Sequence, residues 1–353
     1  MEKIQKATII IPCHNVPEEY IIRAIASVRS QTFPDYEVIV VDDGSEVPYA
    51  AVLERICDDK EKTKLIRIPK SGVSAARNAG IKIANGDYIA FLDADDVLAD
   101  DFLERALAVA EETEADFIIG GLEEAEETAV PYCPPRTGKP QTELFVGEDL
   151  CQTVGRFLIG LRSQITFPGG YIGRGPVSRL IRREIVQGIL FDPALTIGED
   201  LVWNLEILKQ CRKVCLVKES WYSYWQNPLS VIHRRQPELI DEYRKQIEKV
   251  TDLIDITDNG MYASYADQIY EGLRLFWFRY LSSERQKNPE NYRKAVHGVY
   301  TEWPWTEIGT DRYFRQVGGK KRITAVLYRL RLFYPFLAWK ERISPSEICV
   351  SWE

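Results

Sequence analysis

The sequence DYIAFLDADD spans Asp87–Asp96 and has two contrasting parts. An apolar run, Tyr88–Leu92, is followed at once by three carboxylates, Asp93, Asp95 and Asp96. A short run that is rich in aromatic and aliphatic side chains predicts a strand buried on both faces. Such a strand stops where its end reaches water, and in open α/β sheets this end is where ligands bind.

The three carboxylates suggest a cation at the end of this strand. Close carboxylates repel one another unless positive charge is near, and hard divalent cations prefer oxygen ligands and substrate phosphates. We therefore expect Asp95 to contact Mn²⁺ or Mg²⁺, and Asp93 to contact the metal or a ribose. Asp96 is either a third ligand or the cap of the next helix. The acidic cluster alone would favour a solvated strand-to-helix turn, since such turns are common.

The sequence around this stretch alternates between strand and helix patterns. Such alternation predicts an α/β fold with a doubly wound, mostly parallel sheet. Gly44 suits a tight turn, Ser45 is a candidate cap for the next helix, and Asn85-Gly86 suits a left-handed helix end. Besides Tyr88–Leu92, the predicted strands are Ala7–Ile11, Glu37–Val41, Lys64–Ile68 and Asp116–Ile119, and the predicted helices are Glu18–Ser30, Val73–Ala84, Asp101–Glu112 and Leu201–Cys211.

The alternating pattern weakens after Gly121. Gly147–Leu161 predicts one further helix, and two short runs, Val214–Val217 and Trp221–Trp225, are typical of edge strands. From Pro237 onward the sequence is helical in pattern. We therefore divide the chain into residues 1–121, 122–235 and 236–353.

Four blocks of this sequence, taken in order, resemble those of family 2 glycosyltransferases of the bacterial polysaccharide type. Each block is weak evidence alone, but the ordered set is specific. The resemblance implies a GT-A fold, in which residues 1–121 bind a nucleotide-sugar and 122–235 bind the acceptor, with 236–353 as a helical extension. The blocks are Ala7–Pro12 with Asp42–Ser45, Gly72–Gly80, Asp87–Asp96, and Gly198–Asp200.

The resemblance also implies an inverting transfer from a nucleoside-diphosphate sugar, with UDP as the expected nucleotide. Asp43 is then expected to accept the imide N–H of uracil, although the capping of a helix by Asp42 or Ser45 would explain the same acids. Pro12, His14 and Asn15 are expected to line the base pocket, and His14 is otherwise an ordinary turn histidine. Arg77 either reaches the phosphate or pairs with Asp93 or Asp95.

A positioned carboxylate is needed to remove the proton of the acceptor hydroxyl. Asp200 is our candidate for this general base, and Glu199 is the second candidate. Both acids fall at a predicted helix N-terminus, where capping and the helix dipole favour acids in any case. Because the dipole lowers a carboxylate's pKa, we expect Asp200 to be ionised at neutral pH. His233 is a further candidate for a metal or phosphate contact.

Charge and hydropathy restrict the partners and the location. The net charge of −8 argues against a general nucleic-acid binder. We find no secretory signal and no apolar run long enough to cross a membrane, and we expect a cytoplasmic enzyme. Residues 320–342 are basic and aromatic, which suits either peripheral contact with the inner face of a membrane or a helix packed on the core. The expected acceptor is a glycan or a lipid-linked glycan.

Three classes of protein were compared with these patterns. A sugar transferase of hexosyl or N-acetylhexosaminyl groups agrees with all four blocks. A nucleotidyltransferase would carry a glycine-rich, basic loop after the first strand, which Pro12–Asn15 does not provide. A non-catalytic nucleotide-binding protein would have lost the acids at positions 93–96 or 199–200, and all of them are present.

Overall fold

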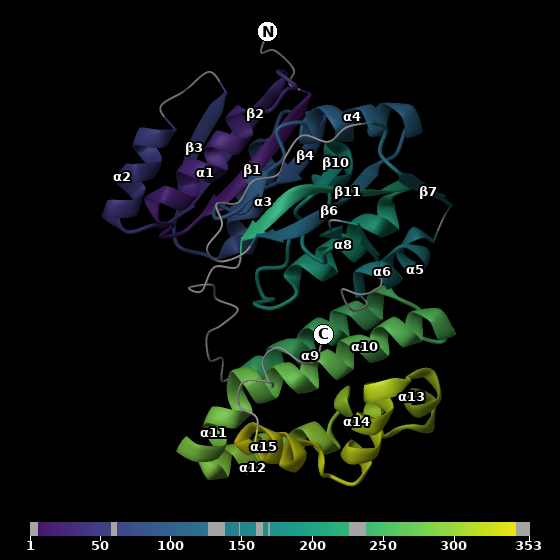
Figure 1. Ribbon diagram of the computed structural model, residues 1–353. Coiled ribbons are helices and arrows are strands. Elements are labelled where there is room, and N and C mark those ends of the chain that lie inside the picture. The colour runs from purple at the N-terminus through teal and green to yellow at the C-terminus, as the bar shows by residue number, and fades with distance from the viewer. Residues whose placement is uncertain are drawn as a thin grey trace. The chain divides into compact units, whose positions relative to one another are not determined.

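The computed structural model describes residues 6–57, 62–125, 138–147, 149–159, 165–168, 170–225 and 238–343. These residues form two compact units (Figure 1). The first unit contains the α/β sheet, and its described residues end at 225. The second unit contains Ile159 and the helical region from 238 onward. Every helix in the described ranges of both units is too short or too polar to cross a membrane.

A mixed sheet forms the centre of the first unit, in the order β3-β2-β1-β4-β10-β6-β11-β5 (Figure 1). The first four strands are parallel, β10 is antiparallel to both of its neighbours, and β6 and β11 are again parallel. β7 pairs with β11, and β8 and β9 extend from β6. The strands are β1 (Ala7–Cys13), β2 (Tyr36–Asp43), β3 (Thr63–Ile68), β4 (Tyr88–Phe91), β5 (Val97–Leu98), β6 (Phe117–Ala125), β7 (Thr142–Val146), β8 (Thr166–Phe167), β9 (Gly170–Tyr171), β10 (Arg179–Arg182) and β11 (Lys213–Trp225).

Helices connect the parallel strands, which confirms the predicted α/β class. Every residue of β1 is buried, as expected for a strand covered on both faces. Helix α3 packs so closely on β1 that a Cβ built on Gly80 would lie 2.5 Å from Ile10 Cγ2. The helices of this unit are α1 (Glu18–Arg29), α2 (Val47–Ile56), α3 (Val73–Ile83), α4 (Phe102–Thr113), α5 (Leu150–Thr153), α6 (Gly155–Ile159), α7 (Arg183–Val186) and α8 (Glu199–Gln210).

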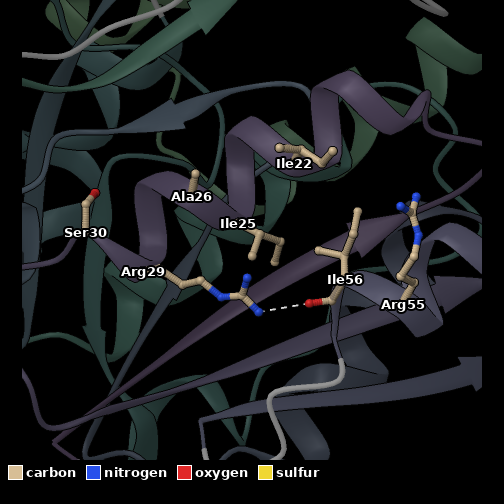
Figure 2. A pocket seen from close by; sticks show the side chains of 7 residues that line it. All are labelled: Ile22, Ile25, Ala26, Arg29, Ser30, Arg55 and Ile56. Carbon is tan, nitrogen blue, oxygen red and sulfur yellow. Dashed lines mark hydrogen bonds between the residues drawn. The ribbon is translucent and has the colours of Figure 1, made fainter.

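Helix α1 buries Ile21, Ile25 and Val28, three of the four residues that predicted its helical spacing. The fourth, Ile22, is 46% exposed and lines a groove beside α2 (Figure 2). Across this groove, the Arg29 guanidinium extends from α1 and donates a hydrogen bond of 2.9 Å to the carbonyl oxygen of Ile56 in α2. The buried face of α1 is therefore narrower than the pattern predicted.

Two helices differ from their predicted form. Helix α3 ends at Ala84 in an extended rather than a left-handed conformation. Gly86 is needed instead because a Cβ there would lie 2.5 Å from the backbone carbonyl carbon of Ala7. The single helix predicted over Gly147–Leu161 consists of two short helices, α5 and α6, and Asp149 caps the first of them.

The two edge strands predicted over Val214–Val217 and Trp221–Trp225 form one strand, β11, inside the sheet. The polar pair Lys218-Glu219 separates the two apolar runs, and the register with β6 shifts at this point. The Glu219 carboxylate lies 2.7 Å from Arg105 Nε and accepts a hydrogen bond from the Trp221 indole. An ion pair therefore interrupts the hydrophobic pattern without ending the strand.

The second unit is helical from 238 onward, as predicted. Its core contains packed aromatic rings, such as Phe276 against Trp305 at 4.7 Å between ring centroids and Trp277 against Tyr334 at 6.1 Å. Its elements are α9 (Leu239–Leu253), α10 (Asn259–Phe276), the π-helix η3 (Trp277–Leu281), α11 (Ser282–Lys287), α12 (Pro289–Thr301), the 3-10 helix η4 (Trp305–Gly309), α13 (Asp311–Gln316), α14 (Gly319–Arg329) and α15 (Phe333–Ile343).

Candidate active site

Most of the residues predicted to bind the nucleotide and the metal lie at the carboxyl ends of β1, β2 and β4. In the parallel register, Cys13 of β1 is opposite Asp42 of β2, and Ile10 is opposite Phe91 of β4. β2 and β4 are not neighbours, because β1 lies between them. Strand spacing therefore separates their ends by about 10 Å, which leaves room for a ligand to lie across the end of β1.

Asp43 is buried at the end of β2 and faces the start of helix α3. Its two carboxylate oxygens accept hydrogen bonds from the backbone N–H groups of Ser71, at 2.6 Å, and Gly72, at 2.8 Å. Ser45 does not cap α2, whose N-cap residue is Glu46 without a side-chain hydrogen bond among the described residues. The Asp43 carboxylate is thus held rigidly by the turn between β3 and α3.

The loop after β1 is joined to the loop after β2. His14 Nδ1 lies 2.9 Å from the carbonyl oxygen of Asp43, to which it donates a hydrogen bond. Asn15, at a φ of +50°, accepts a hydrogen bond of 2.8 Å from the backbone N–H of Glu46. Pro12 is buried within β1. The structure therefore brings Pro12, His14, Asn15 and Asp43 together on one side of the strand ends.

The three acids after β4 have different environments. Asp93 is 34% exposed at its side chain, and Asp95 is half-buried. Asp96 is buried and does not cap the next helix: its carboxylate accepts hydrogen bonds from the Tyr222 hydroxyl, at 2.5 Å, and the backbone N–H of Trp225, at 2.8 Å. Burial raises the pKa of Asp96 well above its usual range, and the charges of Asp95 and Asp93 add to this effect.

Tyr222 links these acids to β11, and the sequence did not identify it. Its hydroxyl donates to Asp96 and accepts a hydrogen bond of 3.2 Å from the backbone N–H of Asp93. The tyrosine ring occupies an apolar strand position, so the sequence pattern gives it only a core role. Its hydroxyl fixes the backbone turn on which Asp93 and Asp95 lie.

Arg77 of α3 joins the acids after β4 to those at the start of α8. Its guanidinium nitrogens lie 3.1 Å from Asp93 Oδ1 and 3.3 Å from Glu199 Oε1. The guanidinium also lies over the ring of Phe191, 5.2 Å from the centroid. Of the two alternatives for Arg77, the ion pair with Asp93 is present, and Glu199 is a second partner that the sequence did not suggest.

Glu199 and Asp200 form the first turn of α8, after Gly198 at a φ of +70°. Burial, followed by the charge of Asp200, raises the pKa of Glu199 to about 7, although Arg77 opposes this rise. Burial also raises the pKa of Asp200, and Arg77 opposes this rise more than any other group. The pKa of Asp200 therefore shifts in the direction opposite to the lowering that the helix dipole suggested.

A loop over residues 173–175 lies beside Asp200. A Cβ built on Gly175 would lie 3.9 Å from Asp200 Oδ2. The Asn204 side-chain amide donates to the carbonyl oxygens of Arg174, Gly175 and Asp200, at 2.9, 3.3 and 2.9 Å. Asn204 was not predicted, but its spacing of four residues from Asp200 on a helix is a signal for a shared face.

Arg179 of β10 holds the same loop from the other side. It is fully buried, and its guanidinium donates to the carbonyl oxygens of Gly120, Gly173 and Ser178. Burial lowers the pKa of Arg179 to about 9, and the charge of Asp200 opposes this change. The sequence shows only a basic run at this position, so it does not predict a buried arginine bound to carbonyl groups.

We tested whether these residues fit a divalent cation. Within the described ranges, no group of three or more His, Cys, Asp or Glu side chains is arranged to hold a metal. Asp93 and Asp95 nevertheless offer partly exposed oxygen donors on one turn, which suits a cation that also binds substrate phosphates. His233, the third predicted ligand, lies outside the described residues.

A sequence model described as "Glycosyl transferase family 2" matches residues 8–189, which is just over half of the 353-residue chain. The match spans the strand ends described above and three of the four blocks. The chain belongs to glycosyl transferase family 2. This confirms the predicted family, and the protein is a glycosyltransferase.

Two curated relatives support the same family. This family 2 glycosyltransferase is 29% identical over 245 residues to "Uncharacterized glycosyltransferase EpsJ" of Bacillus subtilis, covering 68% of this chain and 67% of the relative. It is 25% identical over 292 residues to "Uncharacterized glycosyltransferase YibD" of Escherichia coli, covering 78% and 79%.

A solved structure supports the fold. Residues 1–349 of S. aureus TarS, crystallised with UDP-GlcNAc, match this glycosyltransferase with a TM-score of 0.63 and 18% identity. The match covers 96% of this chain and 92% of the TarS chain. The predicted GT-A fold with additional C-terminal helices is therefore confirmed.

Proposed function

We propose that this glycosyltransferase moves a hexosyl or N-acetylhexosaminyl group from a UDP-sugar to a hydroxyl of a glycan or lipid-linked acceptor, with inversion. The observation that carries the proposal is the bridge made by Arg77, which pairs with Asp93 on one side and Glu199 on the other. Through this bridge, an acid proposed to hold a cation and the donor diphosphate lies close to the acids proposed as general base. The complex of TarS with UDP-GlcNAc supports a UDP-sugar as donor.

The nucleotide would bind across the carboxyl ends of β2, β1 and β4. Asp43 remains our candidate for the uracil imide N–H, because its carboxylate is fixed by two backbone hydrogen bonds and each oxygen has a second lone pair. His14 and Asn15 lie in the loop joined to it and would line the base pocket. The diphosphate would then lie toward Asp93 and Asp95.

Mn²⁺ or Mg²⁺ would be held by Asp93 and Asp95, with His233 as a candidate third ligand. When bound, such a cation supplies Lewis-acid stabilisation of the charge on the leaving diphosphate. Arg77 adds a fixed positive charge next to Asp93, and Asp96 with Tyr222 holds the turn in place. These residues orient the donor while the sugar is transferred.

Asp200 would act as the general base. The acceptor oxygen forms a bond to the anomeric carbon, the bond from that carbon to the phosphate oxygen breaks, and the hydroxyl proton passes to Asp200. A single displacement inverts the configuration. We prefer Asp200 to Glu199 because the Glu199 carboxylate already pairs with Arg77. Asp200 is held by a hydrogen bond of 2.7 Å from the backbone N–H of Leu201.

The experiment that tests this function compares binding with turnover. We expect Asp200→Asn to bind UDP with Mn²⁺ as the wild type does, by calorimetry, while sugar transfer or hydrolysis of UDP-sugars falls by about 10²–10⁴-fold. Asp252→Asn, which changes an exposed acid of the second unit, is the control and should keep full turnover. Normal turnover in Asp200→Asn would remove it from the base role. UDP binding by the wild type without turnover of any UDP-sugar would favour a non-catalytic nucleotide-binding protein.

A further inference from the structure

Large apolar side chains with exposed surface are concentrated on α14, α15 and the turn between them. Of fourteen such residues in the described part of the chain, six fall within residues 320–343, a stretch of 24. Their exposed fractions range from 42% to 62%. They are Ile323, Val326, Leu330, Leu332, Trp339 and Ile343.

Each of the two helices has one packed face and one exposed face. On α14, Ala325 and Tyr328 are buried, whereas Ile323, Val326 and Leu330 follow a spacing of three and four residues on the exposed face. The Tyr328 hydroxyl donates a hydrogen bond of 2.7 Å to the carbonyl oxygen of Val299. The packed face is therefore fixed within the helical unit, and the exposed apolar side chains are not needed for that packing.

Helix α15 repeats this arrangement. Tyr334 and Leu337 are buried, and the Tyr334 ring stacks on Trp277. Trp339 and Ile343, four residues apart, are 58% and 61% exposed. The helices contact each other and are joined by a tight turn in which Arg331 has a φ of +57° (Figure 1).

The same segment carries strong positive charge. Residues 320–343 contain seven lysines and arginines and a single acid, Glu341, although the whole chain has a net charge of −8. Two of the basic side chains, Lys321 and Arg329, form salt bridges within the unit, with Asp267 and Asp311. Three exposed arginines form no salt bridge with any described residue. These are Arg322, Arg331 and Arg342.

We propose that this surface binds an anionic lipid membrane. We name it the basic apolar face and define it by the six exposed apolar residues given above together with Arg322, Arg331 and Arg342. Apolar side chains of an interfacial helix enter the boundary between headgroups and acyl chains, where tryptophan is favoured, and arginines extend to the anionic headgroups. These groups lie on the exposed sides of two helices that contact each other, and their charge complements an acidic bilayer surface.

A second copy of the chain fits this face less well. If two copies met through the same patch, the unpaired arginines would face one another, and like charges brought together across an interface are costly. An anionic surface relieves this repulsion. The charge on the face therefore favours lipid over self-association.

The test measures binding of the full-length chain to sedimented vesicles, without any sugar donor. We expect binding to vesicles of phosphatidylcholine with phosphatidylglycerol, weaker binding in high salt, and little binding to phosphatidylcholine alone. Two double variants test the apolar and the charged groups separately. Leu330→Ser with Trp339→Ser removes apolar side chains, and Arg331→Gln with Arg342→Gln removes positive charge. Each pair should lower the partition coefficient by about 10-fold or more.

A matched control removes the same kinds of group from the first unit. Val47→Ser with Arg212→Gln changes an exposed valine, 79% accessible, and an exposed arginine, and it should bind vesicles like the wild type. The proposal is overturned if the wild type binds no vesicles, or if both variant pairs bind as well as the control. It is also overturned if sedimentation velocity shows a wild-type dimer that the variants convert to a monomer. Hydrolysis of UDP-sugars in solution tests the proposed function separately.

Discussion

A buried guanidinium pairs with two acids of the site. Arg77 lies between Asp93 and Glu199, with Asp200 next in the chain, and the charge of Arg174 also acts on Asp200. These positive charges oppose the effect of burial on the two acids of α8 but do not cancel it. Burial therefore still raises the pKa of both acids, that of Glu199 to about 7.

The raised pKa of Glu199 predicts a pH-dependent stability. Its pKa rises from 4.5 to about 7, so the folded chain binds this proton more tightly than the unfolded chain between these values. The contribution of Glu199 to the free energy of unfolding is full below pH 4.5 and is lost as the pH rises through about 7. The loss should be on the order of 3 kcal/mol. Urea unfolding of the wild type and Glu199→Gln, compared across this range, measures it.

The control is Glu248→Gln, which changes an exposed glutamate of α9. The difference in unfolding free energy between this variant and the wild type should stay constant with pH. If the difference between Glu199→Gln and the wild type were equally constant, the carboxyl of Glu199 would not titrate in this range. The raised pKa of Glu199 would then be wrong.

The sequence predicted where these acids occur but not how they are charged. Asp43, Asp93 and Asp200 could be selected because each follows a strand or starts a helix within a recognisable block. The helix dipole was a correct local argument for Asp200, but burial by the rest of the unit is larger, and burial depends on residues far away in the chain. For the same reason the Arg77–Glu199 pair, 122 residues apart, could not be predicted.

At the scale of elements, β11 supports the acidic turn that follows β4. The strand contributes the Tyr222 hydroxyl and the Trp225 backbone N–H to Asp96, and the same hydroxyl accepts a hydrogen bond from the N–H of Asp93. Because Asp96 is buried, its position is fixed by these partners and not by solvent. The geometry at Asp93 and Asp95 therefore depends on a strand from the other half of the sheet.

Removing the Tyr222 hydroxyl should loosen this turn. We expect Tyr222→Phe to lower the free energy of unfolding by about 1–3 kcal/mol, because it leaves a buried carboxyl with one partner fewer. We also expect weaker Mn²⁺-dependent binding of UDP, because Asp93 and Asp95 lie on the turn that loosens. Urea unfolding and calorimetry measure the two effects.

Tyr36→Phe is the matched control. It removes a buried tyrosine hydroxyl that donates a hydrogen bond of 2.8 Å to the carbonyl oxygen of Val28, at the amino end of β2 opposite the site. This variant should lose similar stability and keep the affinity for UDP. Equal UDP affinity in both variants would show that Tyr222 contributes only to stability.

Strands and helices were largely predictable where the hydrophobic pattern of the sequence continued without interruption. β1, β2 and β4 gave short apolar runs with clear ends, and the predicted boundaries differ from the observed ones by one or two residues. β11 was divided wrongly because Glu219 pairs with Arg105, a partner on α4 that no local pattern shows. The sequence predicted α5 and α6 as one helix. The close contact between Gly155 and Leu205 joins residues far apart in the chain, so no local pattern shows it either.

At the scale of the whole molecule, the two proposals fall on different units. The residues proposed to bind the donor belong to the first unit, and the basic apolar face belongs to the second. The net charge of the chain conceals this division, since residues 320–343 are strongly basic and the remainder is more acidic than the total of −8. The net charge of the whole chain therefore hides the local positive charge on which the membrane proposal rests.

Donor binding should stabilise the folded chain by mass action. A ligand at 100 times its dissociation constant stabilises the native state by about 2.7 kcal/mol. We therefore expect UDP with Mn²⁺ to raise the midpoint of thermal unfolding, and EDTA to remove most of the increase. Asp95→Ala should lose the response because it removes a proposed cation ligand.

The control for Asp95→Ala is Asp87→Ala, at the opposite end of the same strand, where the carboxylate lies 3.8 Å from Lys6 on the surface. This variant should respond to UDP with Mn²⁺ as the wild type does. A full response in Asp95→Ala, or a response of the wild type that EDTA leaves unchanged, would contradict a cation held at this turn.

The loop over residues 173–175 has a consequence for how the enzyme can diversify. Arg179 and Asn204 hold it through the carbonyl oxygens of Gly173, Arg174 and Gly175, and every amino acid supplies such an oxygen. The side chain at position 174 is not one of these backbone anchors, but the charge of Arg174 lowers the pKa of Asp200. A substitution there would therefore change the charge beside the proposed base, on a backbone that stays in place.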